Sequence, residues 1–153
     1  MRIVVGADHA GYALKQLLAA RLAELGHAVT DLGTDSEEPV DYPEFGAAVG
    51  RAVAAGVGEL GLCVCGTGIG IGMAANKVPG VRAAVVHDIT TARLARMHNH
   101  ANVLCLGARV IGEQVAKDAL DAFLEAQPQG GRHDRRVAEL AGLEAPPSVG
   151  MAS

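Results

Sequence analysis

The sequence predicts an α/β domain in which a parallel sheet carries helices on both faces, and three observations lead to this prediction. A length of 153 residues suits one domain with a well-filled core. Hydrophobic residues make up 50% and charged residues 20% of the chain, a balance that excludes wholesale disorder. Short apolar runs alternate with stretches of helical periodicity, as in repeated strand–helix–strand units.

The first part of the chain predicts two strands around one helix. Residues 3–5 are an apolar run typical of a buried strand. Leucines three or four residues apart mark one face of a helix over residues 11–25, and Gly26 suits its C-terminal cap. These leucines are Leu14, Leu17, Leu18, Leu22 and Leu25. Residues 27–32 form the next apolar run, which ends at a glycine and predicts a second strand.

The middle of the chain predicts a helix, a strand and a shorter helix. Asp41-Tyr42-Pro43 has the composition of a helix start, with Asp41 or Tyr42 at the cap and Pro43 in the first turn. Alanine-rich sequence continues this helix to residue 55. Residues 60–65 are apolar and predict a third strand. A glycine-rich turn and a short helix to residue 77 follow.

The last part of the chain predicts strands at 81–86 and 102–106 and helices at 89–97, 112–126 and 132–143. The apolar stripe expected to pack the second of these helices on the sheet is Val115, Ala119, Leu120, Phe123 and Leu124. With right-handed crossovers, five parallel strands and their helices make a three-layer, Rossmann-like sandwich. Ligands of such sheets bind beyond the carboxyl ends of the strands.

We expect a single domain over residues 1–144 and a disordered tail at 145–153. A net charge of −4 and a scarcity of aromatic residues argue against a nucleic-acid partner. The chain has three cysteines, no apparent signal peptide and no apolar stretch of membrane-spanning length. These features predict a cytoplasmic protein whose cysteines remain thiols and which has no membrane partner.

A glycine-rich loop, Cys65-Gly66-Thr67-Gly68-Ile69-Gly70-Ile71-Gly72, follows the third predicted strand. Its glycine spacing does not match the G-x-G-x-x-G fingerprint of dinucleotide sites. The loop presents backbone N–H groups at a helix start, which suits a phosphate or an oxyanion that develops during a reaction. Cys65 lies at the edge of this site, whereas Cys63 and Cys105 fit core positions. We expect no metal site, because no further ligand spacing accompanies the cysteines.

Polar residues also follow or precede other strands. Asp8-His9 follows the first strand, where it can bind sugar hydroxyls or phosphate and move protons, or where Asp8 simply caps the next helix. His98-Asn99-His100-Ala101-Asn102 lies at a helix end between the fourth and fifth strands, and two histidines and two asparagines in five positions are more than the helix carbonyls require. Arg109 follows the fifth strand. The basic segment 132–136 is either a solvated helix face or a phosphate clamp that reaches a neighbouring subunit's site.

Seven motifs, in order from residue 1 to residue 144, resemble those of the type B ribose-5-phosphate isomerases and the related galactose-6-phosphate isomerase subunits. They are Gly6-Ala7-Asp8-His9-Ala10-Gly11, Asp41-Tyr42-Pro43, Cys65-Gly66-Thr67-Gly68-Ile69-Gly70, Ala74-Ala75-Asn76-Lys77, His98-Asn99, Gly107-Ala108-Arg109 and Gly130-Gly131-Arg132-His133. The resemblance implies a sugar-phosphate isomerase of the pentose phosphate pathway. It would interconvert ribose 5-phosphate and ribulose 5-phosphate through a cis-enediol or enediolate, without a metal or organic cofactor.

The resemblance also implies roles for matching positions. Cys65 corresponds to the base that moves a proton between C1 and C2. One branch of the family uses a glutamate at the position of Ile71, a side chain that cannot take a proton. The positions that would hold the oxyanion are Gly66, Thr67, Gly68, Ile69, Gly70 and, from the other side, Asn99. His98, assisted by Asp8, corresponds to the group that opens the furanose ring. The positions that would bind the phosphate are His9, Arg132 and Arg136, with Arg109 and His133 in support.

Members of this family are dimers, and some dimers pair into tetramers, so the resemblance implies a homodimer or tetramer. Their sites combine two chains, and the regions of His98 and Arg132 come from the partner. The C-terminal helix is therefore expected to reach a partner subunit. Two alternatives stay open: an isomerase of allose, galactose or tetrose phosphates, and a non-catalytic sugar-phosphate-binding domain. A cysteine-dependent hydrolase has less support, because nothing in the sequence orients a histidine against Cys65.

Overall fold

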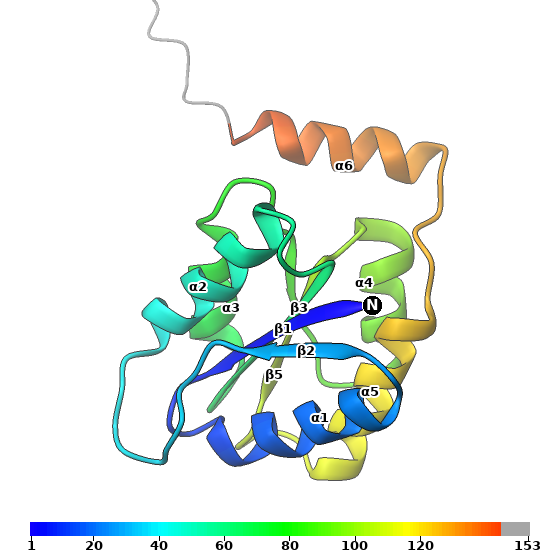
Figure 1. Cartoon of the computed structure of the whole chain (residues 1–153). Helices are drawn as coiled ribbons and strands as arrows, with labels where there is room; N and C mark the ends of the chain where they lie inside the picture. The colour runs from blue at the N-terminus through cyan, green and yellow to red at the C-terminus, as the bar shows by residue number, and fades with distance from the viewer. Residues whose placement is uncertain (145–153) are drawn as a thin grey trace, which may run out of the picture.

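Five parallel strands form the centre of the computed structural model, which describes residues 1–144 (Figure 1). The strands are β1 (Arg2–Ala7), β2 (Ala28–Asp31), β3 (Leu60–Cys65), β4 (Ala83–Val85) and β5 (Val103–Gly107). The helices are α1 (Tyr12–Glu24), α2 (Tyr42–Ala54), α3 (Ile69–Asn76), α4 (Ile89–Asn99), α5 (Glu113–Glu125) and α6 (Arg132–Gly142). The tail predicted at 145–153 lies outside the described residues.

The strands lie in the order β2-β1-β3-β5-β4, and every neighbouring pair is parallel. The chain steps from β1 to β2 in one direction and from β2 to β3 in the other. The sheet therefore has a switch point between β1 and β3, where the loops beyond the strand ends diverge. The two central strands β3 and β5 are buried along their whole length, which explains why their sequences are apolar without alternation.

Helices cover both faces of the sheet, as the sequence predicts. Helices α1, α4 and α5 share one face, and α2 packs with α3 on the other (Figure 1). The first face is built around large side chains such as Leu18, Leu104 and Phe123. The second contains smaller ones, among them Val49, Cys63 and Cys105. Small residues on this second face allow α2 and α3 to approach the strands closely. Gly61 lies against Val49, for example, where an added Cβ would be 2.7 Å from a methyl carbon.

Some predicted apolar positions do not pack on the core. Leu25 is 49% exposed, because α1 ends at Glu24 and Leu25 lies just beyond it. Val115 is 41% exposed in the first turn of α5, so its predicted place on the buried stripe is wrong. Strand β4 is shorter than predicted, although Val81 and Val86 on either side of it are buried.

A fully buried lysine is the largest departure from the predicted pattern. Lys15 lies on α1 between the buried Leu14 and Leu18, and its Nζ donates to both carboxylate oxygens of Asp31 at 2.6 and 2.7 Å. The same Nζ donates to the carbonyl of Thr34 at 2.7 Å. Thr34 in turn donates its amide to the carbonyl of Ala7. The lysine therefore fixes the turn after β2 against the end of β1, next to Asp8.

Helix α6 lies apart from the two layers and runs across one end of the molecule (Figure 1). Its only buried residue is His133. Leu140 is 46% exposed and Leu143, which caps the helix, is 81% exposed. Within residues 1–144, no helix combines the length and apolar composition that crossing a bilayer requires.

Candidate active site

The carboxyl ends of β1 and β3 bring a carboxylate and a thiol together at the switch point of the sheet. Ala7 at the end of β1 is in register with Val64 of β3, so the next residues, Asp8 and Cys65, leave the sheet side by side. The amide of Asp8 donates to the carbonyl of Val64 at 3.3 Å. Both side chains are buried, Asp8 at 7% and Cys65 at 4% exposure. This is the position at which open α/β sheets bind ligands.

The Cys65 sulfur lies at the N-terminus of α3. The backbone N–H of Gly68 donates to its Sγ at 3.1 Å. Gly68 has a φ of +77°, and an added Cβ would stand 2.8 Å from the carbonyl carbon of Leu106. Only glycine fits this position, because an L side chain is strained there and meets the backbone of β5. The loop thereby directs the Gly68 amide at the sulfur, at a helix N-terminus of the kind that binds anions.

The remaining positions of the loop are held by neighbours from two other elements. Arg109, after β5, donates its amide to the carbonyl of Gly66, and its guanidinium lies over that glycine. The ring of Tyr42, at the start of α2, lies over Gly70, where a Cβ would be 2.6 Å from a ring carbon. Thr67 is exposed at the tip of the loop, and its Oγ1 accepts from the amide of Ile69 at 3.2 Å. Arg109 therefore contacts the loop that follows Cys65.

The residues after β1 have defined hydrogen bonds. Asp8 Oδ1 accepts from the amide of Gly11 at 3.0 Å, so Asp8 does shape the entry to α1 while remaining beside Cys65. His9 places Nδ1 at 3.1 Å from the amide nitrogen of Val40 and 3.2 Å from its carbonyl oxygen. When Nδ1 accepts from that amide, the ring proton is on Nε2, the nitrogen that can then donate to an anion.

The other predicted site residues lie at the opposite end of the sheet, where the strands begin. Helix α4 starts after the carboxyl end of β4 and ends at Asn99, before β5 begins at Val103. Strand β5 then runs back to the Cys65 end, a rise of about 13 Å at 3.3 Å per residue. His98 and Asn99 therefore lie at the amino ends of the strands, together with α6, which carries Arg132, His133 and Arg136. The described chain does not bring these five residues to Cys65.

Two stacked histidines hold this second group together. The rings of His98 and His133 are 4.3 Å apart between centroids, with 3° between their planes. Burial lowers the pKa of His133, and the neighbouring charges of His98, Arg132 and Arg136 lower it further. The neutral form of His133 is thereby favoured in the folded chain.

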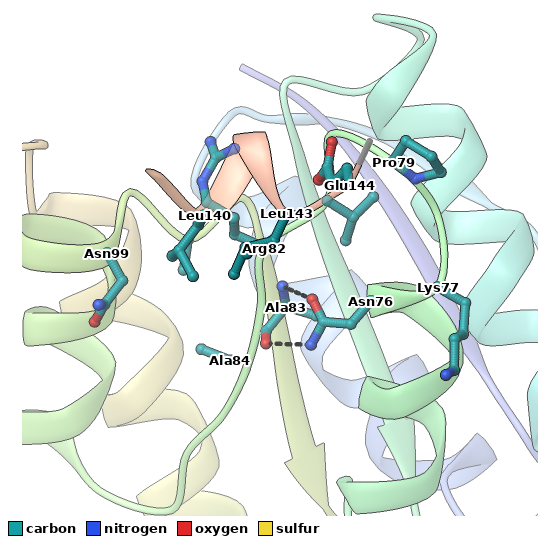
Figure 2. A pocket seen from close by; sticks show the side chains of 12 residues that line it. Asn76, Lys77, Pro79, Arg82, Ala83, Ala84, Asn99, Leu140, Leu143 and Glu144 are labelled. Carbon is teal, nitrogen blue, oxygen red and sulfur yellow. Dashed lines mark hydrogen bonds between the residues drawn. The ribbon is translucent and has the colours of Figure 1, made fainter. Parts of the chain in front are cut away.

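A cavity of about 610 Å³ opens at the same end of the sheet, between the end of α6 and the segment after α3 (Figure 2). Leu140, Leu143 and Asn99 lie on its wall, and neither Cys65 nor Asp8 lines it. Below it, the Asn76 amide exchanges two hydrogen bonds with the backbone of Ala83, at 2.8 and 2.9 Å. The exposed leucines of α6 therefore face a hollow rather than the chain's own core.

The three cysteines divide as the sequence predicts. All are free and buried, and Cys63 lies opposite Cys105 in the register of β3 and β5. The hydrogen bond to Cys105 raises the pKa of Cys63 well above its ordinary value, and burial raises it further. Cys63 therefore remains a protonated core thiol, whereas Cys65 contacts the loop. Within residues 1–144, no group of three or more histidine, cysteine or acidic side chains could hold a metal ion.

Comparison with known proteins identifies the family. The ribose/galactose isomerase family matches residues 3–140, and the chain belongs to this family. The ribose-5-phosphate isomerase B of Escherichia coli K12 is 46% identical over 143 residues, which cover 94% of this chain and 96% of that protein.

Solved structures agree with this assignment. The ribose-5-phosphate isomerase B of Clostridium thermocellum superposes with a TM-score of 0.93 at 49% identity, covering 94% of this chain and 97% of that one. The ribose-5-phosphate isomerase B of Mycoplasma genitalium, solved with bound ribulose 5-phosphate, gives a TM-score of 0.90 at 41% identity and covers 94% and 95% of the two chains. The predicted α/β fold is therefore confirmed, and so is the family resemblance.

Sequence reasoning missed two residues at the Cys65 end of the sheet. Tyr42 was predicted as part of a helix start, and its contact with Gly70 follows only from the packing of α2 beside α3. Lys15 falls within a leucine-rich helix, where its charge gave no indication of burial. The feature of the sequence that could have indicated a buried Lys15 is its acidic partner Asp31, at the end of the second strand and 16 residues away.

Proposed function

We propose that this chain interconverts ribose 5-phosphate and ribulose 5-phosphate, with Cys65 as the base. The observation that carries the proposal is the position of the Cys65 sulfur at the N-terminus of α3. It accepts a hydrogen bond from the Gly68 amide, and Asp8 lies beside it. Membership of the ribose/galactose isomerase family and the ribulose 5-phosphate bound in a 41%-identical relative support this choice of substrate.

The proposed chemistry is a proton transfer along one face of the open-chain sugar. The Cys65 thiolate takes the proton from C2 of the aldose, and the electrons of that C–H bond form the C1–C2 double bond of an enediolate. Charge develops on the sugar oxygens, where the amides of residues 66–70 and the Thr67 hydroxyl can donate hydrogen bonds. The proton on O2 passes to O1, the Cys65 thiol returns its proton to C1, and the C2=O2 carbonyl of the ketose forms. Every step uses groups of the protein, and we propose neither a metal nor an organic cofactor.

A second copy of the chain completes the proposed site. His98, with Asp8, would open the furanose ring, and Asn99 would bind the enediolate from the side opposite the loop. Arg132 and Arg136 would bind the phosphate together with His9, supported by Arg109 and His133. Of these residues, His98, Asn99, Arg132, His133 and Arg136 are separated from Cys65 by the length of β5. This separation supports a homodimer in which each site combines the Cys65 end of one copy with the His98 end of the other. A tetramer would be two such dimers. The free thiols support the predicted cytoplasmic location.

The proposal is tested by isomerisation in heavy water. The wild-type chain should convert ribose 5-phosphate, and solvent deuterium should appear at C1 of the ribulose 5-phosphate formed, because the Cys65 thiol can exchange its proton with solvent before returning it. Cys65→Ala should lose at least about 100-fold in kcat. Cys63→Ala is the matched control, because it removes a neighbouring thiol that does not contact the loop. Binding of the sugar phosphate without deuterium incorporation would indicate a non-catalytic binding domain instead. A higher kcat/KM for allose, galactose or tetrose phosphates would change the assigned substrate but retain the chemistry.

A further inference from the structure

A left-handed histidine stands where α4 ends. His100 has φ 49° and ψ 39°, and it is the only non-glycine residue at positive φ within residues 1–144. Histidine adopts this conformation more readily than most residues, but glycine is the usual choice at the end of a helix. Such a departure points to a role for the side chain at this position.

The His100 ring joins α4 to the segment that leads into α6. Its Nε2 lies 2.7 Å from the carbonyl oxygen of Gln129, and because a carbonyl only accepts, Nε2 is the donor. The backbone N–H of Gln129 donates to the carbonyl of Met97 at 2.9 Å, so both backbone polar groups of residue 129 are hydrogen-bonded to the end of α4. The Asp134 carboxylate, in the first turn of α6, lies 3.5 Å from Nε2. The side chain of His100 is 16% exposed, whereas that of Asp134 is 63% exposed.

Helix α6 has few other means of attachment. Among the described elements it packs chiefly on α4, and it follows an extended segment that contains Gly130 and Gly131 (Figure 1). The His98–His133 stack is a second link, and the bond from the Gly80 amide to Glu144 is a third, beyond the far end of the helix. The His100 bond holds the segment just before α6, whereas the His98–His133 stack holds the first turn itself, next to Arg132. The two links together set where the first turn of α6 lies.

We infer that His100 is a positioning residue for the phosphate-binding arginines. Arg132 and Arg136 are four residues apart on α6, so they project from one side of the helix. They are exposed, and nothing but the pose of α6 orients them in the described chain. Holding Gln129 and the α6 start against α4 keeps the two guanidinium groups at fixed positions relative to His98 and Asn99. The inference rests on the proposed function, because it assigns the phosphate of the sugar to these arginines.

Two substitutions separate the ring's hydrogen bond from the backbone conformation. His100→Asn suits the left-handed region but ends too short to reach Gln129. His100→Gln suits that region less well but places an amide nitrogen near the position of Nε2. Loss of one such hydrogen bond is expected to weaken binding about 3- to 10-fold. His100→Asn should therefore bind inorganic phosphate about 3- to 10-fold more weakly than wild type, and His100→Gln should bind it more tightly than His100→Asn.

Titration with inorganic phosphate, followed by ³¹P NMR, measures the Kd for each variant. His100→Asn should also raise KM for ribose 5-phosphate more than it lowers kcat, and it should shift the ring protons of His98 and His133. An unchanged phosphate Kd in His100→Asn would overturn the inference. So would tighter phosphate binding by His100→Asn than by His100→Gln, because backbone conformation would then dominate. Failure of the wild-type chain to isomerise the sugar would instead count against the proposed function.

Discussion

The substitution Gly68→Ala tests how strictly the loop places the Cys65 sulfur. Gly68 has a φ of +77°, which costs an L residue about 1–2 kcal/mol. Its new Cβ would stand 2.8 Å from the carbonyl carbon of Leu106, 3.1 Å from the carbonyl oxygen and 3.2 Å from the Gly107 amide. These neighbours are backbone atoms of a central strand, so the loop must move rather than the strand. Overpacking of this kind costs about 1–3 kcal/mol, and the free energy of unfolding should fall by roughly 2–5 kcal/mol.

The displacement should also reach the reaction. The Gly68 amide is the donor to Sγ, so any movement of residue 68 weakens that bond and shifts the adjacent amides from the developing oxyanion. Loss of one oxyanion donor typically lowers kcat about 100- to 1,000-fold, and we expect a decrease of this size. The assay is kcat for ribose 5-phosphate, corrected for the folded fraction by urea denaturation of the same preparation.

Gly26→Ala is the matched control for this experiment. Gly26 has a φ of +86°, but an added Cβ would meet no atom within 4 Å. It should show the conformational cost of about 1–2 kcal/mol and leave kcat unchanged. A Gly68→Ala variant with wild-type kcat would refute the reasoning, because the loop would then tolerate displacement. A decrease in kcat of equal size in Gly26→Ala would refute it as well.

Three further results are expected. Lys15→Met should lower the free energy of unfolding by about 2–3 kcal/mol in urea, since it removes the Nζ donor of the Thr34 carbonyl and leaves Asp31 with the Gly33 amide as its remaining donor; no change would contradict the pairing. Because the pKa of His133 is lowered, its contribution to stability is present above the ordinary value of 6.5 and is lost as the pH falls through the lowered pKa. Thermal unfolding between about pH 8 and pH 5 should show this loss in the wild type and less of it in His133→Gln, and identical profiles would be inconsistent with it. Gly70→Ala should displace the Tyr42 ring and shift its NMR signals while the fold persists, and unshifted signals would exclude the contact.

Local patterns predicted the sheet well because its central strands are buried on both faces. Residues 60–65 form β3 with the predicted bounds, since an apolar run has no other place in such a fold. The edge strand β4 covers only Ala83–Val85 of the predicted 81–86, because β5 alone pairs with it. Val115 shows the limit of helical periodicity: an apolar residue in the first turn need not face the sheet.

The site was predictable to different degrees in its two parts. The loop after β3 and Asp8-His9 were found because strand ends in parallel sheets meet at one edge. Lys15 and Tyr42 were not found, since their partners Asp31 and Gly70 lie 16 and 28 residues away and no local pattern joins them. The charge pattern already offered segment 132–136 as a phosphate clamp that reaches a neighbouring subunit, whereas the ring-opening role of His98 came from the family resemblance. Neither pattern showed that α4 and α6 lie at the amino ends of the strands, opposite Cys65.

The central claim is that each site combines the end of the sheet that carries Cys65 in one copy with the end that carries His98 in another. Co-expression of Cys65→Ala chains with His98→Ala chains tests it in one activity measurement. Each variant alone should be inactive, whereas mixed dimers would contain one site with both residues intact. With random pairing, the account predicts recovery of about one quarter of the wild-type activity. A mixture as inactive as its two components would contradict the shared site.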